Sequence, residues 1–230
     1  MKYRLFLLDL DDTLLDFRAS ERLSFKRTLA SLGVPDAAEA LFVDYQRINR
    51  ALWTALEQGE ICKDVLKIER FRRLFVLHGI DADPHRASAC YLDWLPQTVV
   101  LIDGARALCD ALAAQGEIGI ITNGIEQVQS RRIAASGLAD RISFVATSEA
   151  CGHAKPDVRF FAFSTAMARQ FVKSRTVIIG DRLEADVLGA NRYGIDSCWF
   201  NPEQRANDGS AMPTIEVNAL RDIPPRLATC

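Results

Sequence analysis

Three aspartates follow the first apolar run of the chain, and they are the side chains in this sequence best suited to carry chemistry. The run Leu5 to Leu8 leads directly into Asp9, Asp11 and Asp12. Asp9 and Asp11 point the same way if the chain is extended there, and two carboxylates that close repel each other unless a cation lies between them. Mg²⁺ fits best, because it prefers carboxylate oxygens and often shares its coordination shell with a substrate phosphate. The pattern therefore favours magnesium-assisted phosphoryl transfer, in which a carboxylate such as Asp9 can carry the phosphoryl group.

Candidate phosphate ligands stand at the ends of later segments. Thr122, Asn123 and Gly124 follow the apolar run Ile118 to Ile121, and Lys155 stands further along the chain. The Thr122 hydroxyl and the Lys155 ammonium are donors for the oxygens of a phosphoryl group in transit. The backbone N–H groups of Asn123 and Gly124 add to them if a helix starts there. Together these groups form a phosphate cradle without a glycine-rich loop.

Two more aspartates, Asp181 and Asp186, come after an apolar run that ends next to Gly180. Asp181 is expected to complete an anionic face with Asp9, because the carboxyl ends of parallel strands meet at one edge of a sheet and ligands bind there. Asp186 follows one helical turn later.

The elements that position these residues alternate between strand and helix. Short, nearly continuous apolar runs predict strands that are buried on both faces, and helical spacing of apolar residues between them predicts crossover helices, which together indicate an α/β fold with a Rossmann-like parallel sheet. We predict C-terminal helix caps at Gly116, Gly137 and Gly194. The predicted strands are Leu5–Leu8, Ile118–Ile121, Ser143–Ala146, Thr176–Ile179 and Cys198–Phe200, and the predicted helices are Ala105–Gln115, Glu126–Ser136, Pro156–Phe171 and Glu184–Tyr193.

One long segment lacks strand-like runs. Between about residue 16 and about residue 98 the apolar residues recur at helical steps, as at Leu41, Tyr45 and Ile48. We therefore predict an inserted all-helical cap over residues 16–98, and a core made of residues 1–15 and 99–230. The segment Asn201 to Ser210 is predicted to be a polar loop.

In order along the chain, four of these segments resemble the four motifs of the haloacid dehalogenase superfamily. The helical insertion between the first and second motifs is similar to the first type of cap in that family, which closes over the site and selects the substrate. The motifs are Asp9-Leu10-Asp11-Asp12-Thr13, Ile120-Ile121-Thr122-Asn123, Lys155-Pro156, and Gly180-Asp181 with Asp186.

The resemblance implies a role for each residue of the motifs. Asp9 would be the nucleophile and Asp11 the general acid and base. Mg²⁺ would be bound by Asp9, Asp181 and the backbone carbonyl of Asp11. Asp186 would support the metal and the lysine from behind, while the phosphate would be held by Thr122 and Lys155.

Two residues of the first motif, Asp11 and Asp12, bear on what the resemblance implies. Family members that cleave carbon–halogen bonds lack an acidic residue at the position of Asp11, so its presence favours phosphate chemistry. Asp12 stands where the family often has glycine, and we interpret it as a turn residue.

Several shorter segments are similar to a subgroup of pyrimidine nucleoside 5′-monophosphate phosphatases. This resemblance implies UMP, dUMP, dTMP or altered pyrimidine nucleotides as substrates, with Trp53 of the cap near the base. A sugar-phosphate or phosphoglycolate phosphatase and a phosphomutase stay open as alternatives. The segments are Leu52-Trp53, Gln58 to Ile61, Glu69 to Arg72, Ile118 to Gly124 and Cys198-Trp199.

Composition limits the partners. With 28 Lys and Arg against 30 Asp and Glu, the formal net charge of −2 provides no field that would gather a nucleic-acid polymer. The six scattered cysteines are expected to be reduced thiols, and the apolar run after Met1 is too short for a signal peptide or membrane span. We therefore expect a cytoplasmic monomer or homodimer whose partner is a small phosphomonoester.

Overall fold

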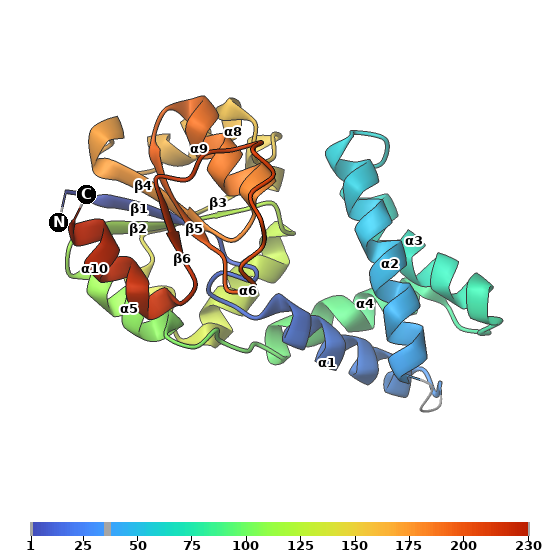
Figure 1. Ribbon diagram of the computed structural model, residues 1–230. Coiled ribbons are helices and arrows are strands. Elements are labelled where there is room, and N and C mark those ends of the chain that lie inside the picture. The colour runs from blue at the N-terminus through green and yellow to red at the C-terminus, as the bar shows by residue number, and fades with distance from the viewer. Residues whose placement is uncertain (1, 35–37, 230) are drawn as a thin grey trace. The chain divides into compact units, whose positions relative to one another are not determined.

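Figure 1 shows the protein as a computed structural model, in which residues 2–34 and 38–229 are described. Contacts divide the chain into two compact units, Met1–Phe17 with Val100–Cys230 and Arg18–Val99. The predicted limits of the helical insertion differ from these by two residues at the first boundary and by one at the second. That the second unit acts as a cap stays a prediction.

The first unit is built on one parallel sheet, as the sequence predicts, and this sheet has six strands where five are predicted. Their order is β3-β2-β1-β4-β5-β6, and each neighbouring pair is parallel. The first strand therefore lies in the interior of the sheet, with β2 on one side and β4 on the other. The strands are β1 (Leu5–Leu8), β2 (Glu117–Thr122), β3 (Phe144–Thr147), β4 (Thr176–Gly180), β5 (Asp196–Phe200) and β6 (Ile215–Val217).

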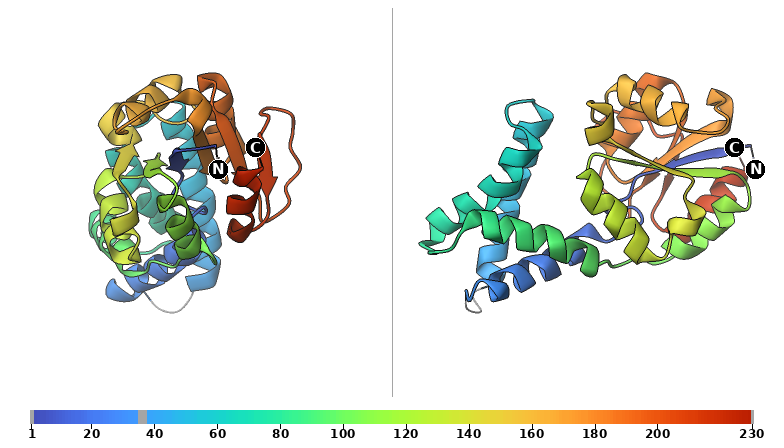
Figure 2. Two further views of the ribbon diagram at one scale, coloured as in Figure 1. Left: turned by 90° about the vertical axis from the view of Figure 1, so that its left-hand side faces the viewer. Right: turned by 180° about the vertical axis from the view of Figure 1, so that it is seen from behind.

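Helices cover both faces of this sheet (Figures 1 and 2). The crossovers after β1 and β2 lie on one face and those around β4 on the other, so that α5, α6 and α10 are separated from α8 and α9 by the sheet. The helices are α5 (Ala105–Ala113), α6 (Glu126–Ser136), α7 (Ser148–Cys151), α8 (Val158–Ala166), α9 (Leu188–Tyr193) and α10 (Ile223–Ala228). Short 3₁₀ turns span Ala139–Arg141, Lys173–Arg175 and Leu220–Asp222, and a π-helical turn spans Leu183–Val187.

The structure corrects some predicted elements. Strand β6 was not predicted, because its three residues alternate buried, exposed and buried at the edge of the sheet and leave too short a pattern. Helix α8 ends at Ala166 and not at Phe171. Gly137 and Gly194 do end helices in the left-handed conformation.

Gly116 was wrongly predicted to be a helix cap. Helix α5 is capped by Ala114 in the right-handed conformation. A Cβ at Gly116 would lie 2.2 Å from the carbonyl oxygen of Arg4, so glycine is needed there for the close approach of two backbones.

The second unit is helical, and its core is aromatic. Buried rings of Phe25, Tyr45, Phe71 and Tyr91 pack with centroids 4.6 to 5.8 Å apart. No helix in the described part of the chain combines the length and the apolar character needed to cross a bilayer. The elements are α1 (Phe17–Ser31, which starts in the first unit), α2 (Ala38–Glu57), α3 (Lys63–His78), α4 (Pro84–Trp94) and a 3₁₀ turn Leu95–Gln97.

The five described cysteines, Cys62, Cys90, Cys109, Cys151 and Cys198, are free thiols, and Cys230 lies outside the described residues.

Candidate active site

The sheet brings the ends of three strands together. Leu8 at the end of β1 is aligned with Ile120 of β2 and with Ile179 of β4. The backbone N–H of Asp9 continues this pairing by donating to the Ile179 carbonyl at 2.9 Å. Since the strands run in parallel, the residues that follow each of them emerge at one edge of the sheet.

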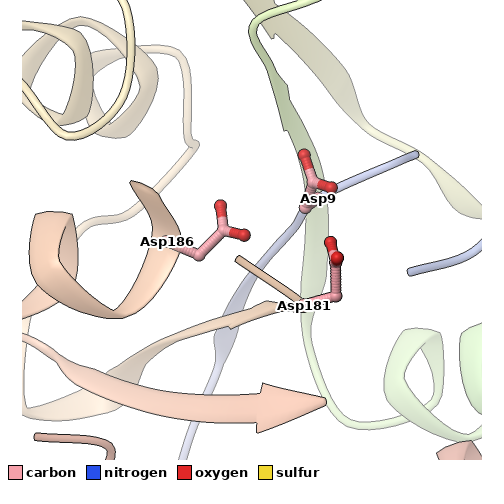
Figure 3. A group of neighbouring side chains, drawn as sticks. All are labelled: Asp9, Asp181 and Asp186. Carbon is pink, nitrogen blue, oxygen red and sulfur yellow. The ribbon is translucent and has the colours of Figure 1, made fainter. Parts of the chain in front are cut away.

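Three carboxylates converge at this edge (Figure 3). One oxygen each of Asp9, Asp181 and Asp186 lie within 4.8 Å of one another. Asp9 comes from the end of β1, Asp181 follows β4, and Asp186 belongs to the π-helical turn. Asp9 and Asp186 are buried, and Asp181 is nearly so.

Lys155 lies among these carboxylates. Its ammonium donates to Asp9 Oδ1 at 2.5 Å, to Asp186 Oδ1 at 2.7 Å and to the Ile121 carbonyl at 2.9 Å. These contacts use all three donors of an ammonium group. The Lys155 side chain is only 3% exposed, so its charge is held inside the protein by the two aspartates.

Burial and mutual repulsion shift the pKa values of two of the three carboxylates, Asp9 and Asp181. Burial, more than the neighbouring charges of Asp186 and Asp11, raises the pKa of Asp9 to about 7, although Lys155 opposes the shift. Burial also raises the pKa of Asp181 to about 8, with Asp9 and Asp186 adding to it. Both carboxylates are therefore costly in their ionised form unless more positive charge is near.

Burial by itself lowers the pKa of Lys155, but the carboxylates of Asp186 and Asp9 outweigh burial and raise the pKa of the ammonium above its ordinary value. Lys155 is accordingly a fixed cation at every physiological pH.

This donor set fits a divalent cation. Lys155 pairs with two of the three carboxylates, Asp9 and Asp186, and Arg205 Nη2 lies 3.8 Å from Asp181 Oδ2. Negative charge remains in excess, and carboxylate oxygens at this spacing are the ligands that Mg²⁺ prefers.

Asp11 is predicted to bind the metal through its backbone carbonyl. The side chain of Asp11 is not part of the carboxylate group and is engaged elsewhere.

Local backbone features allow the Asp186 carboxylate to lie against Gly180 and reach Lys155. A Cβ at Gly180 would lie 2.3 Å from Asp186 Oδ2, so only glycine leaves room for that carboxylate. The same oxygen accepts a hydrogen bond from the backbone N–H of Arg182 at 3.1 Å. Single π turns are frequent at functional sites, and this one presents Asp186 to Lys155.

Asp181 is held by residues that the sequence analysis did not identify. Its backbone carbonyl accepts hydrogen bonds from Trp199 Nε1 at 2.9 Å and Arg205 Nη2 at 2.6 Å. Its carboxylate accepts from the Thr13 hydroxyl at 3.3 Å. Asn201 holds Arg205 in turn, with one hydrogen bond to the backbone carbonyl and one from the backbone N–H, both at 2.9 Å.

The residues after β2 are joined to Lys155. The Asn123 amide donates to the Lys155 carbonyl at 3.1 Å and accepts from the Lys155 N–H at 2.9 Å. Thr122 Oγ1 accepts from the Gly124 N–H and from Gln129 Nε2, both at 3.0 Å. Thr122 and Lys155 are therefore brought to one site, and the phosphate-binding roles of all four predicted residues stay predictions.

Asp11 contacts two side chains of α6 that the sequence analysis missed. Gln129 Nε2 donates to Asp11 Oδ2 at 2.6 Å, and the guanidinium of Arg132 forms an ion pair with Asp11 Oδ1. Gln129 and Arg132 are three residues apart on the buried face of α6. A Gln and an Arg at the same helical spacing as the buried Val128 and Ile133 were the signal that could have identified them.

Comparison with known proteins assigns the family. Residues 3–194 match the haloacid dehalogenase-like hydrolase family. The chain belongs to that family. The match includes every residue of the carboxylate group and Lys155.

Three relatives of this haloacid dehalogenase-like hydrolase match over nearly their whole length. The HAD-hydrolase YfnB of Bacillus subtilis is 34% identical, over 96% of this chain and 94% of that protein. The pyrimidine 5′-nucleotidase PynA of Streptococcus pneumoniae is 38% identical, over 97% and 94%. The pyrimidine 5′-nucleotidase YjjG of Escherichia coli is 30% identical, over 97% of each.

A solved structure resembles this hydrolase closely as well. The crystal structure of YfnB bound to magnesium superposes with a TM-score of 0.91 at 34% identity and covers 99% of both chains. With its family, its relatives and Asp11 taken together, the chain is a phosphomonoester hydrolase.

Asp12 adopts a backbone conformation that glycine usually occupies. Its φ is 57°, in the left-handed region, which explains why glycine is frequent at this place in the family. Its Oδ1 accepts from the N–H of Phe17, the first residue of α1, at 3.0 Å. Asp12 is therefore a turn residue, as predicted, and its carboxylate satisfies a helix N–H.

Proposed function

We propose that this hydrolase transfers the phosphoryl group of a small phosphomonoester to Asp9 and then to water. The observation that supports this best is the environment of Asp9, a buried carboxylate at a strand end with one oxygen bonded to Lys155. That hydrogen bond restricts rotation of the carboxylate, and it leaves Asp9 Oδ2 as the candidate nucleophile.

In the first step, Asp9 Oδ2 forms a bond to phosphorus while the bond from phosphorus to the ester oxygen breaks. The proton that the leaving oxygen needs comes from the carboxylic acid form of Asp11. Thr122 donates a hydrogen bond to the phosphoryl oxygens, where charge is spread in the transition state, and the Lys155 ammonium exchanges one of its three present acceptors for a phosphoryl oxygen. The products are the free alcohol and an aspartyl phosphate on Asp9.

In the second step, a water molecule attacks the phosphorus of the aspartyl phosphate. Its proton passes to the carboxylate of Asp11, which restores the acid for the next turnover. The bond from phosphorus to Asp9 breaks, and inorganic phosphate leaves.

The proposed ligands of Mg²⁺ are Asp9, Asp181 and the backbone carbonyl of Asp11, with Asp186 in support. When bound there, the ion would supply positive charge next to the phosphoryl oxygens. The excess of negative charge in the carboxylate group supports this proposal.

Pyrimidine nucleoside 5′-monophosphates are the substrates that we propose. The support comes from PynA and YjjG, two relatives named pyrimidine 5′-nucleotidases that match over almost the whole chain. It also comes from the motif similarities of the helical unit and of the segment around Thr122. Trp53 of the helical unit is the proposed neighbour of the base.

The test is a substrate panel with purified protein and Mg²⁺. We expect phosphate release from UMP, dUMP and dTMP with a higher kcat/KM than from purine nucleotides, sugar phosphates or phosphoglycolate. Asp9→Asn protein, purified in the same way, controls for contaminating phosphatases. Equal or faster turnover of a sugar phosphate would replace the nucleotidase assignment by the sugar-phosphatase alternative. Isomerised substrate without released phosphate would indicate a mutase.

A further inference from the structure

The carboxylate of Asp11 is held at both of its oxygens by α6. Gln129 Nε2 donates to Oδ2 at 2.6 Å, and Arg132 Nη1 pairs with Oδ1. Arg132 Nη1 also donates to Gln129 Oε1 at 2.8 Å, so the two α6 side chains fix each other. With both oxygens accepting hydrogen bonds, Asp11 has a defined rotamer and a defined orientation of its carboxylate plane.

The burial of these groups is very uneven. The Arg132 side chain is 1% exposed and lies over the Phe17 ring at 5.3 Å, while that of Asp11 is 29% exposed. Within the described residues, Arg132 Nε and Nη2 have no hydrogen-bond partner. A buried guanidinium with two unpaired nitrogens costs stability, and an ion pair with a half-buried carboxylate compensates for little of that cost. Fold stability therefore does not explain why an arginine is placed there.

The same network reaches the phosphate cradle. Gln129 Nε2 donates to Thr122 Oγ1 at 3.0 Å as well as to Asp11. A Cβ on Gly124 would lie 2.3 Å from Gln129 Nε2, so the glycine leaves the space that this amide needs. Gln129 thus ties the position of Asp11 to the position of Thr122.

We infer that Arg132 and Gln129 are positioning residues for Asp11, a role that rests on the proposed function. They hold its carboxylate at a fixed place relative to Asp9 and Thr122 for the two proton transfers. General acid–base groups contribute about 10²- to 10⁴-fold to rate, and this contribution falls steeply when the group is misplaced. Arg132 acts through Asp11 and does not touch the substrate.

The alternative role for Arg132 is a direct contact with the phosphate of the substrate. An arginine that binds the phosphate would lower KM, whereas one that positions Asp11 leaves KM unchanged and raises kcat. These two roles are separated by how kcat and KM change on substitution.

The variants are Arg132→Met and Gln129→Met, each in the parent and in an Asp11→Asn background. Methionine keeps apolar contact with the Phe17 ring, and Asp11 is exposed enough to be solvated when its partner is removed. The matched control is Arg131→Met, the exposed neighbour on the same helix. Turnover is measured with p-nitrophenyl phosphate, whose leaving group needs little protonation and keeps the Asp11→Asn activity measurable. Thermal unfolding confirms that each variant is folded.

We expect Arg132→Met to lower kcat about 10- to 100-fold with KM within about twofold, as for a misplaced acid–base group. In the Asp11→Asn background the same substitution should cost less than about threefold, because the residue through which it acts is already lost. Gln129→Met should likewise cost less kcat in the Asp11→Asn background than in the parent, although the loss of its hydrogen bond to Thr122 adds an effect that both backgrounds share. Arg131→Met should change neither constant.

An equal loss of kcat in both backgrounds, or a rise in KM at constant kcat, overturns the positioning role. If Arg132→Met does not fold, the Gln129→Met pair decides by the same criterion. A parent protein that hydrolyses no phosphomonoester overturns the proposed function, and that result is distinct from an active parent whose variants lose activity additively.

Discussion

The Lys155 ammonium lies 2.5 Å from Asp9 Oδ1, and both side chains are buried. The same ammonium lies 2.7 Å from Asp186 Oδ1, so one lysine is hydrogen-bonded to two carboxylates that are themselves neighbours. Lys155 is therefore predicted to support the fold of the core as well as to bind phosphate.

Replacing Lys155 by methionine leaves Asp9 and Asp186 without their cation. Removing one partner of a buried ion pair typically costs about 3–5 kcal/mol, so we expect a loss of this size in the free energy of unfolding of metal-free protein. Urea unfolding measures it, with the exposed Lys26→Met as control. We also expect Mg²⁺ to restore part of the loss. A Lys155→Met protein as stable as the control would show that the carboxylates do not need this lysine.

Asp9→Asn is expected to abolish turnover while the fold stays intact. A neutral amide does not attack phosphorus, yet its oxygen can still accept the hydrogen bond from Lys155. Because burial raises the pKa of Asp9 to about 7, the amide also removes a costly charge, and metal-free stability at neutral pH should not fall. Steady-state kinetics and thermal unfolding test both parts. Activity within about tenfold of the parent would remove Asp9 from the nucleophile role.

Metal-free protein is predicted to lose stability as the pH rises. The pKa values of Asp9 and Asp181 are raised in the folded protein to about 7 and about 8, from 3.8 in the unfolded chain. Between these limits the folded state holds protons that the unfolded state has lost, so the free energy of unfolding falls with rising pH. The charged groups that face these two carboxylates are Lys155, Arg205, Asp186, Asp11 and Asp12.

Mg²⁺ should reverse this trend, because it binds the ionised carboxylates and stabilises the folded state more as the pH rises. Urea unfolding with EDTA and with Mg²⁺ over this pH range measures both slopes, and hydrolysis assays in the same buffers should show activity only with Mg²⁺. Full activity in excess EDTA, or equal stability with and without the ion, would contradict the metal assignment.

The sheet and the converging aspartates could be predicted because each signal is local. Asp9, Thr122 and Asp181 each follow a continuous apolar run. Parallel strands bring such residues to the same edge of the sheet, independently of the loops that connect the strands. The position of Asp12 in a turn was also predictable from its place after β1.

Long-range polar partners were beyond that reasoning. Gln129 and Arg132 lie 118 and 121 residues from Asp11 along the chain, and nothing near them in the sequence shows which group they face. Trp199 and Arg205 donate hydrogen bonds to the backbone carbonyl of Asp181. Every residue has such a carbonyl, so the sequence does not mark it as an acceptor. Gly116 looked like a helix cap, since the approach of the Arg4 backbone leaves no mark in the sequence.

Gly124→Ala is predicted to lower activity through Gln129. The added methyl would lie 2.3 Å from Gln129 Nε2, and a flexible amide can move aside, so the protein should fold while Asp11 and Thr122 lose a shared donor. We expect kcat to fall about tenfold or more, as for a displaced acid–base group. The control is Gly152→Ala, which has open space but a φ of +76°. That variant should lose about 1 kcal/mol of stability and keep its kcat, so a drop in kcat there would point to a general effect of destabilisation.

Substitutions at Asp12 are expected to separate the cost of its backbone conformation from the value of its hydrogen bond. Both Asp12→Ala and Asp12→Gly remove the acceptor for the Phe17 N–H, but only alanine keeps a Cβ at a φ of 57°. Alanine should therefore be less stable than glycine by about 1 kcal/mol, the usual cost of the left-handed region. Gln204, with a φ of 51°, offers the matched pair, and the same difference between alanine and glycine is expected there. Chemical denaturation of the four variants measures these differences. Equal stability of the two Asp12 variants would mean that the turn relaxes out of the left-handed region once the carboxylate is gone.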